Sequence, residues 1–265
     1  MDINSLFAAL SIACYGYLAF RHWGDANAQA SSNKDHIIAL LAIAMHWWIT
    51  IDKTIVDQGY ILSFANTGSI VAVFIASLIF LASLRHPINS LASPTYAIAA
   101  LVIIVAATDV LPTPEANVMQ GGLLTHVMLS LFGYATLTIA AIHATALSIQ
   151  EQRLKARQTS RILRFLPPLQ TMEKLLFQII WAGIAFLSLG IVSGIIFLED
   201  IFAQHLVHKT VLSILAWAIF AVLLWGRHVL GWRGNTAVRL TLAGFVFLML
   251  AFFGSKLVLE VILHR

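Results

Sequence analysis

Residues 175–198 read LLFQIIWAGIAFLSLGIVSGIIFL, twenty-four positions without one charged side chain. About twenty apolar residues are enough for an α-helix to cross the ~30 Å hydrocarbon core of a bilayer. The run is continuously apolar and does not alternate between apolar and polar residues, which excludes a strand of a membrane β-barrel. This stretch therefore predicts a transmembrane helix.

Similar apolar segments recur along the whole chain. Eight can be marked, at residues 3–20, 37–51, 66–84, 95–111, 123–149, 175–198, 206–225 and 238–259. The composition agrees, with 60% hydrophobic and 11% charged residues, against about 25% charged residues in a soluble domain. An ordinary cytosolic enzyme and a disordered chain are both excluded. The sequence predicts an all-α polytopic membrane bundle of about eight transmembrane helices, with segment 37–51 the shortest.

Basic residues are distributed unequally between the predicted loops. Of the 16 Lys and Arg residues, twelve lie in the loops after the first, third, fifth and seventh segments or at the start of the eighth segment, and the opposite side of the membrane holds only Lys53, Lys209, Lys256 and Arg265. Because cytoplasmic loops carry the excess of Lys and Arg, both termini are predicted to face outward. This asymmetry accounts for the net charge of +4 without nucleic acid as a partner. The basic loop 150–174 serves as a topology anchor or binds anionic lipid head groups.

The single cysteine, Cys14, limits the possible chemistry. One cysteine cannot make a disulfide framework, a CxxC redox pair or a CxxCH haem attachment site. The sequence also lacks a Walker loop, a GxGxxG turn, an HExxH motif and a carboxylate cluster within the apolar segments,. Segment 3–20 has no basic start or cleavage site, so a retained first helix is predicted rather than a signal peptide.

Ionisable residues inside membrane helices are the natural functional candidates, and here they are mainly histidines. His46 and His126 lie within predicted helices, each about 5–9 Å below the outer membrane boundary at 1.5 Å per residue. Two imidazoles at matched depth on neighbouring helices suit the two axial positions of a haem iron. Two separate interhelical hydrogen bonds are the alternative. No single segment has the histidine pair of a two-haem cytochrome b, so at most one haem is predicted.

Three stretches carry a resemblance to a known family. They are 123–137 (LLTHVMLSLFGYATL), 167–193 (PPLQTMEKLLFQIIWAGIAFLSLGIVS) and 209–257, which contains KTVLSILAW, GWRG and AGFVFLMLAFFGSKL. Together they resemble the cytochrome c assembly protein family, the CcsA/CcmC-type membrane haem handlers. The match implies a domain of that type at 66–265, preceded at 1–65 by two transmembrane helices and an outer loop. It also implies a bacterial inner membrane location and bound haem b.

The resemblance places individual residues. His126 falls in the family's HV…SY position, and Tyr134 falls in its tyrosine slot. Lys209 and Trp217 match the lysine and tryptophan of a second family stretch, while His264 lies one residue from a late outer histidine. The family role is to move or present haem at the outer face for attachment to apocytochrome c, without catalytic turnover by the chain itself.

Residues and resemblance together predict four haem-binding histidines: His126 first, His46 second, and then His264 and His208. His126 and His46 are the predicted ligands of the haem iron. The predicted partners are haem, the lipid bilayer, and apocytochrome c or another membrane assembly subunit.

One departure from the family pattern supports a second interpretation. The predicted outer loop 199–209, EDIFAQHLVHK, has no tryptophan, whereas the family's loop is rich in tryptophan and presents the haem edge. The alternative is an accessory or regulatory membrane subunit that keeps the fold without delivering haem. A secondary transporter is disfavoured because the sequence shows neither discontinuous helices nor paired carboxylates within the apolar segments.

Overall fold

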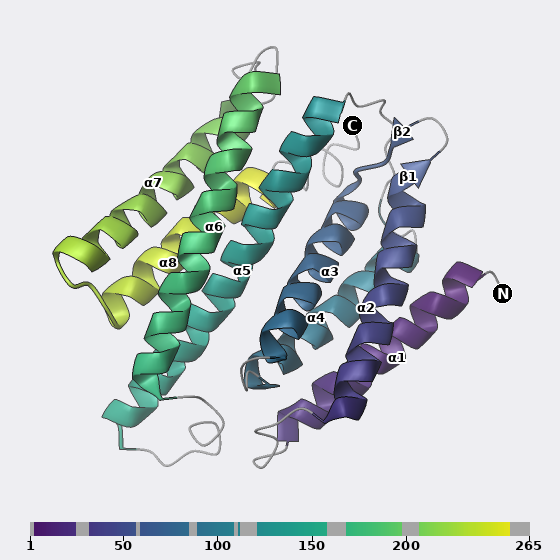
Figure 1. Ribbon diagram of the computed structural model, residues 1–265, viewed down its shortest axis with the longest axis horizontal. Helices are drawn as coiled ribbons and strands as arrows, with labels where there is room; N and C mark the ends of the chain where they lie inside the picture. Colours follow the sequence, from purple (N-terminus) through teal and green to yellow (C-terminus); the bar gives the residue numbers. More distant parts are fainter. Residues whose placement is uncertain are drawn as a thin grey trace. The chain divides into compact units, whose positions relative to one another are not determined.

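The computed structural model describes residues 3–24, 32–56, 59–84, 89–108, 111, 121–157, 168–197 and 207–254. Within these ranges the chain forms eight α-helices, one pair of short strands and a π-helical turn (Figure 1). The elements are α1 (Ile3–Gly24), α2 (Asn33–Thr54), β1 (Ile55–Val56), β2 (Gly59–Tyr60), α3 (Phe64–Ser83), α4 (Asn89–Ala107), α5 (Gly121–Lys155), α6 (Leu169–Phe197), α7 (Val207–Val229), α8 (Asn235–Met249) and η2 (Leu250–Gly254).

Seven of these helices are long and apolar enough to cross a membrane. The remaining helix, α4, contains the shorter apolar stretch Ala92–Ala107. The predicted all-α membrane bundle of about eight helices is therefore confirmed. The outward orientation of both termini stays a prediction.

The chain divides into two compact units, with the boundary between Met119 and Gln120. Unit 1 contains α1 to α4 and the strand pair, and unit 2 contains α5 to α8 and η2. Within unit 1, α1 and α3 each pack against both α2 and α4; within unit 2, α5 and α7 each pack against both α6 and α8 (Figure 1). Each unit is thus a ring of four consecutive helices. The division at residue 65, which follows sequence resemblance, stays a prediction and differs from this boundary.

The start of α2 explains why its length was underestimated from sequence. Ser32 caps the helix in a capping box with Asp35. The Ser32 side chain accepts a hydrogen bond from the backbone of the first turn, and the Asp35 side chain accepts one from the backbone nitrogen of Ser32,. Arg21 of α1 forms an ion pair with Asp35 at 2.9 Å. Because these contacts stabilise a polar first turn that hydropathy treats as loop, α2 has 22 residues. The prediction that segment 37–51 is the shortest is wrong, since α4 holds the shorter apolar stretch.

A short strand pair closes one end of unit 1. Ile55 pairs with Tyr60 and Val56 pairs with Gly59 in antiparallel register. The side chain of Asn66 then ties this end together, donating to the backbone oxygens of Lys53 at 2.9 Å and of Ile61 at 3.0 Å. We refer to this region as the hairpin end of unit 1. Two-residue strands are too short to leave a pattern in the sequence.

In unit 2, α5 and α6 approach each other closely through glycines. A Cβ atom placed on Gly133 would lie 3.0 Å from the backbone nitrogen of Leu187, and one on Gly190 would lie 3.0 Å from Ser130 Oγ. Small residues of this kind let membrane helices pack backbone against backbone. The close approach brings backbone carbonyls of α6 within reach of side chains on α5.

The GWRG segment at 231–234 is the turn between α7 and α8. Gly231 (φ +67°) and Gly234 (φ +57°) both have a positive φ, which glycine tolerates best,. The ring of Trp232 lies against Gly226, where a Cβ would come within 2.2 Å of it. Arg227 donates from Nη1 to the Trp232 carbonyl at 3.2 Å. These contacts give the motif a structural role.

Candidate functional site

His126 lies on α5, within its first two turns, and its imidazole is directed at α6. The ring nitrogen Nδ1 is 2.9 Å from the backbone oxygen of Gly190 and 3.2 Å from Ser193 Oγ. The Ser193 hydroxyl itself donates to the Gly190 oxygen at 2.8 Å. Two groups of α6, the Gly190 oxygen and the Ser193 hydroxyl, therefore fix the orientation of the His126 ring.

These contacts also determine which nitrogen of His126 carries the proton. A carbonyl oxygen only accepts hydrogen bonds, so Nδ1 must be the donor to Gly190. In the neutral ring the lone pair then resides on Nε2, which makes no hydrogen bond within the described part of the chain. A histidine that donates one ring N–H to a backbone carbonyl and offers the other nitrogen is the usual arrangement of a metal-ligating histidine. The donor chemistry of His126 fits an axial ligand of haem iron.

His46 has a different environment. It is fully buried in unit 1, with Nε2 3.1 Å from Ser69 Oγ on α3 and Nδ1 3.4 Å from the Tyr15 hydroxyl on α1. The Ser69 hydroxyl is in turn 2.8 Å from Thr50 Oγ1. Both ring nitrogens of His46 are thus within hydrogen-bond distance of protein groups. Ligation of iron would require one of these two contacts to break.

The four predicted histidines do not lie in one described cluster. His46 belongs to unit 1 and His126 to unit 2, so their pairing stays a prediction. His208 is exposed in the first turn of α7, and His264 lies outside the described residues. Within the ranges that the structure describes, no group of three or more His, Cys, Asp or Glu side chains could hold a metal ion.

Other residues placed by the resemblance have structural contacts in unit 2. Tyr134 is buried, and its ring centroid lies 5.4 Å from that of Phe252 and 5.3 Å from that of Phe253 in the π-helical turn. Trp217 of α7 donates from its indole nitrogen to Ser188 Oγ of α6 at 2.9 Å. Both aromatic side chains link neighbouring helices of this unit.

His143 is a histidine to which the sequence assigned no role. It is buried on α5, and its Nε2 lies 2.8 Å from the backbone oxygen of Met172 on α6. Nε2 is therefore the donor, and the buried Nδ1 has no hydrogen-bond partner in the described residues. The pattern repeats that of His126, but His143 is only 1% exposed, so no ligand reaches it in this conformation.

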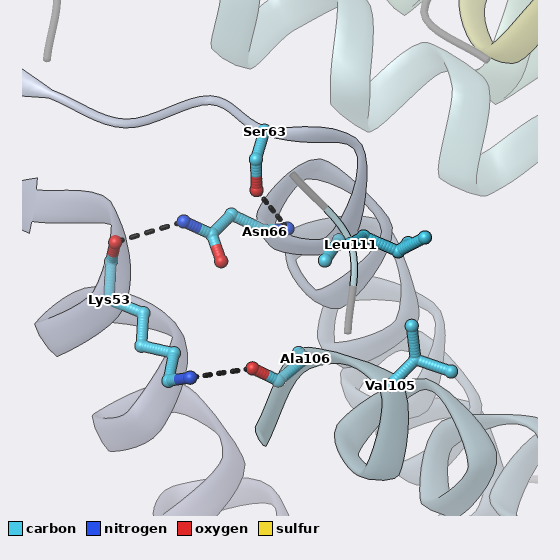
Figure 2. Close-up of a pocket in the computed structure, with 7 residues that line it drawn as sticks. Lys53, Ser63, Asn66, Val105, Ala106 and Leu111 are labelled. Carbon is cyan, nitrogen blue, oxygen red and sulfur yellow. Dashed lines mark hydrogen bonds between the residues drawn. The ribbon is translucent and has the colours of Figure 1, made fainter. Parts of the chain in front are cut away.

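The hairpin end of unit 1 contains a cavity of about 210 Å³. Figure 2 shows Lys53 reaching across it, with Nζ donating to the backbone oxygen of Ala106 at 2.6 Å. On the opposite wall, Ser63 Oγ accepts from the backbone nitrogen of Asn66 and caps α3. The cavity thus has polar groups from α2, α3 and α4 around it.

Comparison with known proteins now places the chain in a family. Residues 33–263 match the model of the family described as cytochrome C assembly protein. The chain belongs to this family. The match begins well before residue 66, where the resemblance was expected to start, and so includes α2 with His46 as well as His126.

Named relatives agree with this membership. The chain is 35% identical to the inner membrane protein YpjD of Escherichia coli K12 over 231 residues, which cover 85% of this chain and 86% of that protein. It is 31% identical to protein HemX of Brevibacillus brevis over 50% of this chain and 49% of HemX. It is 26% identical to the cytochrome c biogenesis protein CcsA of Chlamydomonas reinhardtii over 58% of this chain and 42% of CcsA. No solved structure matches the chain significantly.

Proposed function

We propose that this member of the cytochrome c assembly family binds haem within a bacterial inner membrane, with His126 as an axial ligand of the iron. The observation that carries the proposal is the hydrogen bond from His126 Nδ1 to the Gly190 oxygen, which leaves the lone pair on Nε2. When bound, haem would supply an iron that accepts an imidazole nitrogen, and His126 would hold it. The relative named inner membrane protein supports the location.

The remaining parts of the site follow from the chain's own residues. The sequence has no CxxCH attachment motif,, so the proposal is that haem is held without thioether bonds, as haem b. Since both ring nitrogens of His46 contact protein groups, we assign one of the two iron ligands, His126; the second ligand, for which His46, His208 and His264 are the predicted residues, stays a prediction. Only neutral imidazole binds iron, so haem is expected to dissociate as the pH falls.

The test is the absorption spectrum of protein purified in detergent and loaded with haem. We expect a Soret band at one haem per chain, with an unattached haem that acidified acetone extracts completely. Haem that stays with the polypeptide after extraction would contradict the non-covalent site. A wild-type protein that binds no haem under these conditions would overturn the proposal.

A second candidate function has one observation in its favour. The sequence between α6 and α7 has no tryptophan, although the resemblance expects an aromatic surface there to present haem. An accessory subunit could therefore bind haem at His126 without passing it to apocytochrome c. In that case its partner is another membrane assembly subunit, and the chain has no turnover of its own.

Haem staining of membrane c-type cytochromes separates delivery from this accessory role. We expect deletion of the gene to lower covalently bound haem only partly, if at all, because the sequence between α6 and α7 lacks the tryptophans of the family's loop. A strain carrying His126→Ala in place of the wild type should match the deletion strain. Complete loss of stained cytochromes in both strains would contradict the accessory role and establish delivery.

A further inference from the structure

Unit 1 has an unusually polar interior for a membrane protein. Of the seventeen buried polar or charged side chains in the described residues, twelve lie in unit 1. Polar side chains inside membrane helices are costly, and those that persist often mark ion or proton pathways. Their arrangement along the unit therefore indicates what they do.

The centre of this arrangement is a chain of hydrogen-bonding groups from three helices. The Tyr15 hydroxyl, the His46 ring, Ser69 Oγ and Thr50 Oγ1 follow one another at separations of 3.4, 3.1 and 2.8 Å. Hydroxyls and neutral imidazole both donate and accept hydrogen bonds. Each member of the chain can therefore pass a proton to the next.

Toward the hairpin end the polar chain continues through two threonines. Thr54 lies one turn beyond Thr50 on α2, and Thr67 lies in the first turn of α3. Their hydroxyls are buried and have no hydrogen-bond partner in the described residues. An unpaired buried hydroxyl costs about 1–3 kcal/mol, and ordered water is the usual remedy. The cavity of about 210 Å³ in Figure 2 lies at this same end, lined by Lys53 and Asn66, the chain neighbours of Thr54 and Thr67, and it is large enough for water,.

Toward the opposite end a second buried tyrosine, Tyr96, packs against Tyr15. The rings of Tyr15 and Tyr96 lie 5.5 Å apart at an interplanar angle of 21°. Tyr96 lines a second cavity, of about 10 Å³, together with His22, Asp35 and His36. That volume is close to what one water molecule needs. Nε2 of His36 is buried there without a hydrogen-bond partner in the described residues.

The polar groups extend over the thickness of a membrane. Asp35 and Thr54 stand near the two ends of α2, nineteen residues or about 28 Å apart,. This distance matches the ~30 Å hydrocarbon core. Between the two cavities, Tyr15 and His46 are both completely buried. A hydrated ion does not fit through so closely packed a region, whereas a proton moves by exchange between hydrogen-bonded groups.

We propose that unit 1 conducts protons across the membrane along this relay. A proton enters at the Asp35 cavity or at the hairpin end, and water bridges the intervals between each cavity and the hydrogen-bonded groups Tyr15, His46, Ser69 and Thr50. Each of these groups releases its own proton to the next as it receives one. His46 accepts a proton at one ring nitrogen and releases one from the other, so its net charge is restored after each transfer. Before the next transfer, the hydroxyls rotate and the His46 ring returns to its first tautomer, so that every hydrogen bond again points in the original direction. Only protons move, and no oxidant or reductant is consumed.

This activity goes beyond haem binding and uses residues of unit 1 alone. A ring nitrogen that ligates iron cannot exchange protons, so the relay role of His46 and its predicted ligation exclude each other. Loss of haem at His126 should leave proton conduction intact. The two proposals can therefore fail separately.

Proton flux into vesicles tests the proposal directly. The full chain is reconstituted into phosphatidylcholine–phosphatidylglycerol vesicles loaded with a pH-sensitive dye, and valinomycin with a potassium gradient supplies the driving potential. We expect the wild type to acidify the vesicle interior faster than protein-free vesicles do. Ser69→Ala and Thr50→Val, which remove hydroxyls of the relay at little change in volume, should lose this excess flux.

Ser11→Ala is the matched control. The Ser11 hydroxyl is equally buried in unit 1, but it donates to the Ala42 backbone oxygen at 2.9 Å and stands outside the relay. Its flux should equal that of the wild type, and circular dichroism should give equal helix content for every variant compared. Replacing sodium with choline should change nothing. Wild-type flux equal to that of empty vesicles, a sodium requirement, or equal flux in Ser69→Ala and Ser11→Ala would overturn the proposal.

Discussion

Replacing His126 with alanine is expected to abolish the low-spin haem spectrum of the purified, haem-loaded protein. The substitution removes Nε2, the nitrogen whose lone pair is left available by the hydrogen bond from Nδ1 to Gly190. Ser193 and the Gly190 carbonyl remain, but neither supplies a nitrogen ligand for iron. The absorption spectrum after loading, compared with that of the wild type, measures the effect.

Two further measurements show whether the loss of the spectrum is due to the missing imidazole of His126. Added imidazole should enter the space left by the truncated side chain, bind iron and restore part of the low-spin spectrum. His228→Ala is the control, because His228 is exposed near the end of α7 and contacts Trp181 by its ring edge. Its spectrum should equal that of the wild type. A wild-type spectrum in the His126→Ala variant would rule out ligation by His126.

The same measurement on His46→Ala separates the two roles considered for His46. If His46 ligates iron, its removal converts low-spin haem to a high-spin form. The hydrogen bonds of His46 to Tyr15 and Ser69 lead us to expect an unchanged spectrum. This outcome would leave the second axial position to another group.

The helices could be predicted from sequence because hydropathy depends on composition within each segment. Their ends could not, since they depend on partners. The first turn of α2 contains Lys34 and Asp35 and looks like a loop, but the Ser32 capping box and the ion pair with Arg21 make it helical. Arg21 is fourteen residues away in sequence from Asp35, on another helix.

The side chains of the candidate site, like the helix ends, depend on contacts that the sequence does not reveal. Sequence located His46 and His126 at similar depths inside helices, and both are indeed helical. It could not show that His46 faces Tyr15 and Ser69, because the rotation of a helix about its axis depends on packing. Glycines and serines on facing membrane helices were the available signal: Gly190 lies 64 residues from His126 yet accepts its hydrogen bond.

The close approach of α5 and α6 leads to the second large expected effect. Gly133→Leu should lower the thermal unfolding midpoint of the detergent-solubilised protein, because a Cβ at Gly133 already lies 3.0 Å from Leu187 N and 3.3 Å from its Cα. These are backbone atoms of α6, which cannot rotate away as a side chain does, so the helices must separate. Overpacking of this kind costs about 1–3 kcal/mol, and Gly133→Ala should show a smaller effect in the same direction.

Separation of the two helices should also disturb His126. Gly133 lies seven residues from His126 on α5, about 10 Å along the axis,, so the Nδ1–Gly190 contact should lengthen and haem retention should fall with stability. Gly16→Leu is the matched control, because nothing lies within 4 Å of a Cβ at Gly16 of α1. Replacing this helical glycine should leave haem content unchanged and stability equal or higher by up to about 1 kcal/mol. Equal midpoints for Gly133→Leu and the wild type would refute the close packing on which the orientation of His126 depends.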